Sequence, residues 1–110
     1  MPLLIFYIGT HDSGDKIDHI NHLIQAVQSV GDWRGLCGNL NVDEGTMNIL
    51  KHSTDRPETK MAECLQAYFD SGEATWSQVV RAVAMHPIKN KRLAKEIAND
   101  HSIDFDTIIS

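Results

Sequence analysis

Apolar residues recur at helical spacing along most of this chain. Between residues 15 and 30, aliphatic side chains stand three or four positions apart, which is the spacing of one face of a helix. These residues are Ile17, Ile20, Leu23, Ile24, Val27 and Val30. The pattern predicts an amphipathic helix over residues 15–30 that ends at Gly31.

A second helix is predicted over residues 33–40, and it opens on the first of two tryptophans, Trp33. Gly35 and Gly38 lie inside it, and a glycine within a helix costs about 1 kcal/mol relative to alanine. The helicity of this piece must therefore come from packing against the rest of the chain.

Polar and proline residues mark the starts of the next two predicted helices. Asp43 is expected to cap a helix over residues 43–52. After a polar loop, Pro57 suits the first turn of a helix over residues 58–69. The inward positions are Met47 and Leu50 in the first of these, and Met61, Ala62, Leu65, Tyr68 and Phe69 in the second.

The most complete helix start lies around the second tryptophan. Thr75 is expected to cap this helix, and Gln78, three residues on, to reach back and complete a capping box. The helix should continue to about residue 85, because Pro87 disfavours helical backbone just before it. Its apolar face comprises Trp76, Val79, Val80 and Val83.

The two ends of the chain are expected to lie outside the helical domain. A last helix is predicted over residues 90–100, followed by a tail at 102–110. Residues 1–14 form an N-terminal extension in which 3–8 are apolar; these could form a short strand, pack on the helices or end an upstream region. No other segment alternates as a strand does. The sequence therefore predicts one all-α domain over residues 15–101.

Charge is unevenly distributed. The net charge of -5 counts against a dedicated nucleic-acid or membrane binder. Residues 1–50 hold six acidic and two basic residues, whereas residues 86–98 hold four basic residues and one acidic residue. A molecule with separate acidic and basic regions can pair with copies of itself or with relatives.

Cysteine usage favours a reducing compartment, and hence the cytoplasm. Cys37 and Cys64 occupy apolar positions of helical patterns, so both are expected to be buried free thiols. Two cysteines make no disulfide framework. No apolar run approaches the roughly 20 residues that a membrane span needs, so no membrane partner is expected.

The residues that carry chemistry in enzymes do not form a recognisable motif. His19 and His22 share one helix face near His11, but neither a Cys-x-x-Cys nor a His-Glu-x-x-His motif occurs, so no metal and no cofactor are predicted. The two glycines of the second helix do not follow a strand, as a phosphate-binding loop would require. We therefore expect no catalysis and no small-molecule substrate.

The ordered set of motifs resembles a death domain. It consists of Trp33-x-x-Leu36-Cys37-x-x-Leu40-Asn41-Val42-Asp43 with Met47 and Leu50, then Met61-Ala62-x-x-Leu65-x-x-Tyr68, then Ala74-Thr75-Trp76-x-x-Val79, and finally Leu93-Ala94-x-x-Ile97. The resemblance covers about residues 16–100. Tyr68 stands where the family usually has tryptophan, and Asn41 stands where it has glycine.

The resemblance implies a six-helix antiparallel Greek-key bundle, the death fold. It also implies a non-enzymatic adaptor that binds other death-domain proteins or copies of itself in cytoplasmic signalling complexes, of the apoptotic or innate-immune type. Such domains oligomerise through several charged surfaces used together.

Three groups of charged residues are candidates for partner binding. The acidic group is Asp15, Asp18, Asp43 and Glu44. The basic group is Lys89, Lys91, Arg92 and Lys95. The loop group is Asp55, Arg56, Glu58 and Lys60, together with Asp70 and Arg81. Single exposed pairs contribute little, so useful affinity requires several at once.

Two other interpretations remain open. The basic segment 86–98 could contact phosphates, which would make the chain a helical nucleic-acid-binding module with steep salt dependence. The chain could also be a purely structural helical domain of a larger protein, as the apolar residues 3–8 suggest.

Overall fold

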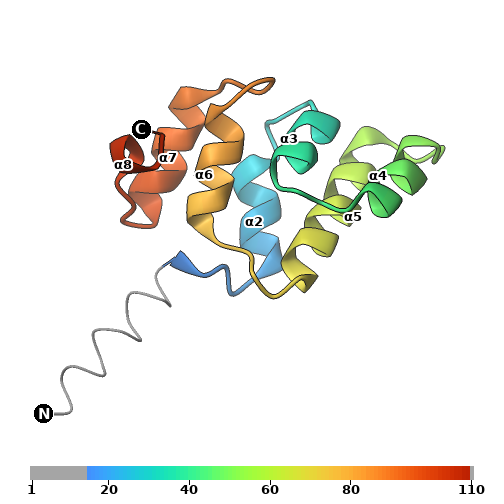
Figure 1. Cartoon of the computed structure of the whole chain (residues 1–110), viewed down its shortest axis with the longest axis horizontal. Coiled ribbons are helices and arrows are strands. Elements are labelled where there is room, and N and C mark those ends of the chain that lie inside the picture. Colours follow the sequence, from blue (N-terminus) through green and yellow to red (C-terminus); the bar gives the residue numbers. More distant parts are fainter. Residues whose placement is uncertain (1–14, 110) are drawn as a thin grey trace, which may run out of the picture.

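Helices follow one another along residues 15–109, the part of the chain that this computed structural model describes (Figure 1). Seven have described bounds: α2 (Ile20–Val27), α3 (Trp33–Asn39), α4 (Glu44–Lys51), α5 (Pro57–Asp70), α6 (Trp76–Ala84), α7 (Lys91–Asp100) and α8 (Phe105–Ile109). No strand occurs in this range, which confirms the all-α prediction. None of these helices is long and apolar enough to cross a membrane.

Five of the six predicted helices begin and end within about two residues of the expected positions. The first is the exception, because α2 begins only at Ile20 and ends at Val27. Before it, the backbone N–H of Ile17 donates to the carbonyl of Ala74 at 3.2 Å, and Lys16 forms an isolated bridge with Thr75. This pairing uses backbone groups that a longer helix would need.

The predicted tail is also partly helical. After α7, Ser102 has a left-handed backbone with φ 57°, and the N–H of Ile103 donates to the carbonyl of Ala98 at 2.8 Å. α8 then packs on α6 and α7, at the left of Figure 1. The predicted tail over residues 102–110 thus contains a short helix at Phe105–Ile109, which the sequence analysis did not predict. The predicted apolar segment 3–8 lies outside the described residues.

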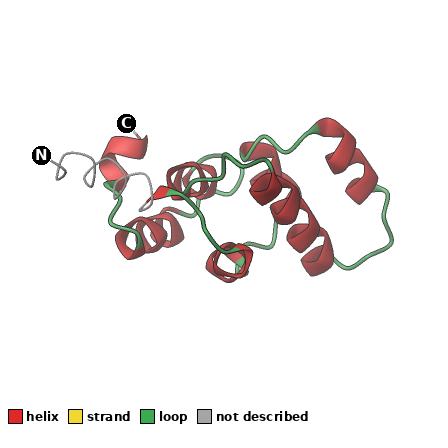
Figure 2. Cartoon of the chain, turned by 90° about the horizontal axis from the view of Figure 1, so that it is seen from below, coloured by secondary structure: helices red, strands yellow, loops and turns green. Residues whose placement is uncertain are grey.

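The core lies where α6 meets its neighbours. α6 packs on α7 and α8 on one side and on α3 on the other, and α5 contacts α2, α3 and α4 (Figures 1 and 2). Trp33 is 8% exposed and Trp76 is 3% exposed, so both tryptophans are core residues as predicted. The fully buried side chains include Leu23, Val27, Leu36, Leu65, Val79, Val80 and Val83.

Side-chain caps fix the starts of four helices. Asp32, Asp43, Thr75 and Asn90 each accept a hydrogen bond from a backbone N–H three residues on. The caps on α4 and α6 confirm the sequence prediction. Each cap satisfies a donor that has no partner within its helix.

The capping box at α6 differs from its prediction. Thr75 accepts from the N–H of Gln78 at 3.3 Å, as expected, but the Gln78 side chain does not return to Thr75. The Gln78 side-chain oxygen accepts from the hydroxyl of Tyr68 instead. That hydroxyl also accepts from the N–H of Thr75 at 3.1 Å. The hydroxyl of Tyr68 on α5 thus binds both the Gln78 side chain and the Thr75 N–H, the two groups that would bond to each other in a capping box.

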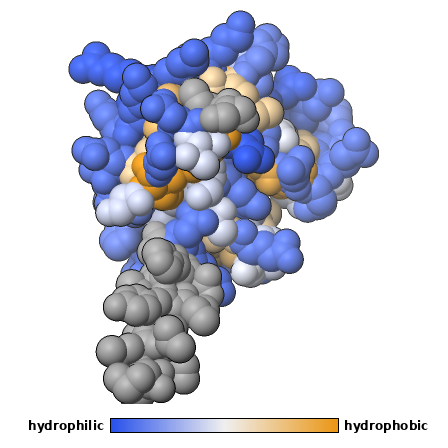
Figure 3. Space-filling model, turned by 60° about the vertical axis from the view of Figure 1, so that its left-hand side comes forward, coloured by the Kyte–Doolittle hydropathy of each residue, from blue (hydrophilic) through white to orange (hydrophobic). Residues whose placement is uncertain are grey.

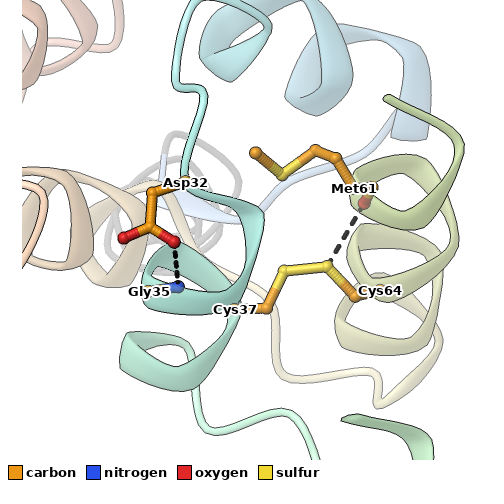
Figure 4. The surroundings of a disulfide bond; sticks show 5 residues. All are labelled: Asp32, Gly35, Cys37, Met61 and Cys64. Atoms are coloured by element: carbon orange, nitrogen blue, oxygen red, sulfur yellow. Dashed lines mark hydrogen bonds between the residues drawn. A yellow bond between two sulfur atoms is a disulfide. The ribbon is translucent and has the colours of Figure 1, made fainter. Parts of the chain in front are cut away.

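A disulfide joins α3 to α5 through Cys37 and Cys64 (Figure 4). Both residues are fully buried, as predicted, but the expectation of free thiols is wrong. Their Cα atoms are 6.4 Å apart, within the range that disulfides span. Helical periodicity placed both residues on inward faces, but it does not reveal which inward residues meet.

Candidate functional site

Four cations gather where α6 turns into α7, and we name them the basic surface: Lys89, Lys91, Arg92 and Lys95. Lys89 has a left-handed backbone with φ 51°, and its N–H donates to the carbonyl of Met85 at 2.9 Å. Asn90 then caps α7 by accepting from the N–H of Leu93 at 3.1 Å. The turn and the cap bring the four cations onto one end of α7.

The basic surface has little carboxylate to neutralise it. All four residues are exposed. Arg92 pairs loosely with Glu96, with 3.9 Å between Nε and Oε1 and side chains 92% and 61% exposed. Lys95 Nζ lies 5.5 Å from the ring centroid of Phe105 in α8. Two of the four cations stand in the first turn of α7, where the helix dipole disfavours positive charge.

Asp15 and Asp18, from the predicted acidic group, precede α2. The half-buried carboxylate of Asp15 accepts from the backbone N–H of Ser77 at 2.9 Å and from its hydroxyl at 2.7 Å. Asp15 therefore provides an acceptor for a backbone N–H in the first turn of α6, which has no acceptor within the helix. Asp18 is exposed, and its side chain makes no hydrogen bond with residues 15–109.

Asp43 and Glu44 belong to a different surface, at the start of α4. Asp43 accepts from the backbone N–H of Thr46 at 2.9 Å and from its hydroxyl at 2.8 Å. These bonds lower the pKa of the Asp43 carboxyl. α4 packs on α3 and α5, whereas Asp15 is tied to α6, so the structure does not gather the four predicted acids into one patch.

The predicted loop group is divided between the two ends of α5. Its start carries Asp55, Arg56, Glu58 and Lys60. Asp70 stands at the other end of this 14-residue helix, which is about 20 Å long. Lys60 Nζ lies 5.7 Å from the ring centroid of Trp33, and Asp70 accepts from Gln66 Nε2 at 2.8 Å. Arg81 is exposed on α6. These residues form several small surfaces.

His101, which the sequence did not single out, stacks on Trp76. The ring centroids are 3.8 Å apart and the planes differ by 13°. Burial is the main cause that lowers the pKa of His101; Asp100 opposes this shift, and His22 adds to it. The spacing of residues along the sequence could not reveal this contact, because the two residues come from the ends of different helices.

A polar hollow opens beside Tyr68, with a volume of about 300 Å³. Its lining includes Asn41, which has φ 61°, and Glu73 from the α5–α6 connection. Asparagine tolerates this left-handed backbone better than most residues with a side chain. Burial raises the pKa of the Tyr68 phenol, so its hydroxyl remains a donor to Gln78.

The histidines offer no metal centre in the described part of the chain. The rings of His19 and His22 are tilted, with centroids 5.4 Å apart. No group of three or more histidine, cysteine, aspartate or glutamate residues within 15–109 is placed to hold a metal ion. His11 lies outside the described residues.

No protein-family model, curated protein or solved structure matches this chain, so the residues described above are the basis for assigning a function.

Proposed function

We propose that this chain is a non-enzymatic interaction module of the death-domain type, which associates with copies of itself or with related domains in signalling complexes. The basic surface supports the proposal more than any other feature. Its cations are exposed and weakly paired, and two of them, Lys91 and Arg92, stand in the first turn of α7 against the helix dipole. Such an arrangement does not stabilise the fold, and departures of this kind are expected at functional sites.

The partner surface would be acidic. Asp18 is exposed without a hydrogen-bonding partner in the described range, and Asp100 is exposed at the far end of α7. A neighbouring copy could bring these carboxylates to the basic surface, because the two groups occupy different parts of the molecule. Charge complementarity of this kind sets orientation and association rate. The six-helix Greek-key order inferred from the sequence belongs to the same proposal.

The test is molar mass by size-exclusion chromatography with light scattering, over a range of protein concentrations at low and high salt. We expect growth beyond the monomer that salt weakens. The variant Lys89→Glu/Arg92→Glu should remain monomeric while circular dichroism shows an unchanged helix content. A strict monomer for the wild type at every condition would contradict self-association.

A matched control variant distinguishes an effect of the basic surface from an effect of net charge. Arg34→Glu/Lys51→Glu makes the same change in net charge on α3 and α4, at exposed residues outside the basic surface. This control should associate as the wild type does. Equal loss in both variants would mean that net charge, and not the basic surface, governs association. A gel shift with oligonucleotides at low salt would instead favour the nucleic-acid interpretation.

A further inference from the structure

Two adjoining hollows form a groove between the end of α3 and one side of α6, and we name it the α3–α6 groove. One is the polar hollow beside Tyr68, with a volume of about 300 Å³. The other has a volume of about 320 Å³ and extends to Arg81 and Met85. The two hollows meet, because they share three lining residues: Leu40, Asn41 and Gln78.

Side-chain hydrogen bonds hold the walls of this groove in place. Asn39, at the end of α3, donates from Nδ2 to the carbonyls of Ala82 at 3.0 Å and of His86 at 3.1 Å. The hydroxyl of Tyr68 on α5 donates to the side chain of Gln78 on α6. The groove is therefore formed within a single chain and needs no partner to shape it.

The two ends of the groove carry opposite charges. Asp43 and Glu73 line one end, and Arg81 lines the other. The side chains of Glu73 and Arg81 are exposed, and neither makes a hydrogen bond or an ion pair within the described part of the chain. Lys89 of the basic surface adjoins the positive end, because its N–H donates to the carbonyl of Met85 at 2.9 Å.

The positive end also exposes an apolar side chain. Met85 is 43% exposed, and among the described residues it and Ile49 are the exposed large apolar ones. On the face seen in Figure 3, hydrophilic side chains dominate and apolar ones form separate patches. Methionine is unbranched and flexible, so it adapts to irregular contact surfaces. Met85 can therefore supply apolar contact where Arg81 supplies charge.

The opposite charges make the groove complementary to itself. In a two-fold dimer, each contact occurs twice, with the roles of the two copies exchanged. With the axis near Asn41 and Gln78, Arg81 of one copy would face Glu73 of the other, and the same pair would form on the other side of the axis. The repetition matters, because a single exposed ion pair contributes little.

We propose that the α3–α6 groove is the contact surface of a two-fold dimer, and that it is occupied by the same groove of a second copy of this chain. The inference rests on the proposed function, because it requires self-association and because Lys89 extends the positive end. It goes further in naming carboxylates that the cations meet, those of Glu73 and Asp43, and in assigning the symmetry of the pair.

Charge reversal followed by mixing tests this pairing. The variants Arg81→Glu and Glu73→Arg are measured alone and as an equimolar mixture, with the full chain at low salt, by sedimentation velocity. Alone, each variant places like charges at both contacts, so its dissociation constant should rise about tenfold or more. In the mixed dimer both contacts join opposite charges, so the dissociation constant should return to within about threefold of the wild-type value.

A control pair makes the same charge changes elsewhere. Arg34→Glu and Glu63→Arg alter exposed residues of α3 and α5 that do not line the groove. Alone and mixed, these variants should dimerise as the wild type does. Circular dichroism checks the fold of every variant, and a variant that failed to fold could not recover its association on mixing.

The outcomes separate this inference from the proposed function. If Arg81→Glu and Glu73→Arg associate as the wild type does while Lys89→Glu/Arg92→Glu stays monomeric, the inference is overturned and the proposed function stands. Weakening without recovery in the mixture would overturn the self-complementary pairing. Recovery only as open-ended growth with concentration would overturn the two-fold symmetry. A wild type that is monomeric at every concentration would contradict both proposals.

Discussion

Gly35 lies so close to Pro87 that a Cβ atom on Gly35 would stand 2.6 Å from the Cγ of the proline. It would also stand 2.5 Å from an Oδ atom of Asp32, the residue that caps α3. Real Cβ atoms essentially never approach this closely. Glycine at position 35 therefore allows α3 to pack against the turn that leads to the basic surface.

Replacing the two glycines of α3 should have opposite effects. Gly35→Ala should lower the free energy of unfolding by about 1–3 kcal/mol, because it forces α3 away from the turn at Pro87. Gly38→Ala should raise it by about 0.5–1 kcal/mol, because a Cβ there meets no atom within 4 Å and alanine favours helix. Urea unfolding of both variants measures the difference, and equal effects would contradict the close approach.

The hydroxyl of Tyr68 should stabilise the start of α6. In Tyr68→Phe the N–H of Thr75 loses its acceptor, so we expect a loss of about 1–3 kcal/mol in the free energy of unfolding. Gln78→Ala should cost less, because Tyr68 keeps its bonds to Thr75. Chemical denaturation of the two variants tests this order, and a larger loss for Gln78→Ala would contradict it.

The disulfide should contribute substantially to stability. It closes a loop with a sequence separation of 27 residues, for which the chain-entropy model predicts about 3–4 kcal/mol. Cys37→Ala/Cys64→Ala, or reduction with an excess of a dithiol, should therefore lower the midpoint of urea unfolding. Alkylation under denaturing but non-reducing conditions, followed by mass spectrometry, gives the control: two modified cysteines would contradict the bond.

Stability should fall on mild acidification because of His101. Burial lowers its pKa in the folded state below the ordinary value of 6.5. The folded state therefore disfavours protonation, so this stabilisation is present above about pH 6.5 and is lost as the pH falls through the lower folded value. Urea midpoints at pH 7.5 and 5.5 should differ less in His101→Phe than in the wild type. An unchanged difference would assign the effect to other groups.

Local signals in the sequence were sufficient to predict most of the helices. Asp43, Thr75 and Pro57 mark their starts through interactions within one turn, and these interactions need no knowledge of the tertiary structure. The first helix was predicted to begin at residue 15, which was wrong, because the backbone N–H of Ile17 pairs with the carbonyl of Ala74, a residue distant in sequence. Such competition between distant backbone groups leaves no periodic signal.

The candidate site was predictable only in part, for the same reason. Three of the four cations lie on α7 and Lys89 stands two residues before it, so the sequence already places them near one another. The acidic candidates lie on separate elements, and only the fold decides that Asp15 joins Ser77 whereas Asp43 caps α4. The stacking of His101 on Trp76 depends on how α7 packs against α6.

The bond between Cys37 and Cys64 has a consequence for covalent continuity. The whole of α4 and the loop at residues 52–56 lie between the two cysteines. A protease that cuts the backbone once in this loop would leave both fragments joined. The cut chain would keep its full mass under non-reducing conditions and would separate into two pieces only after the sulfur–sulfur bond is opened.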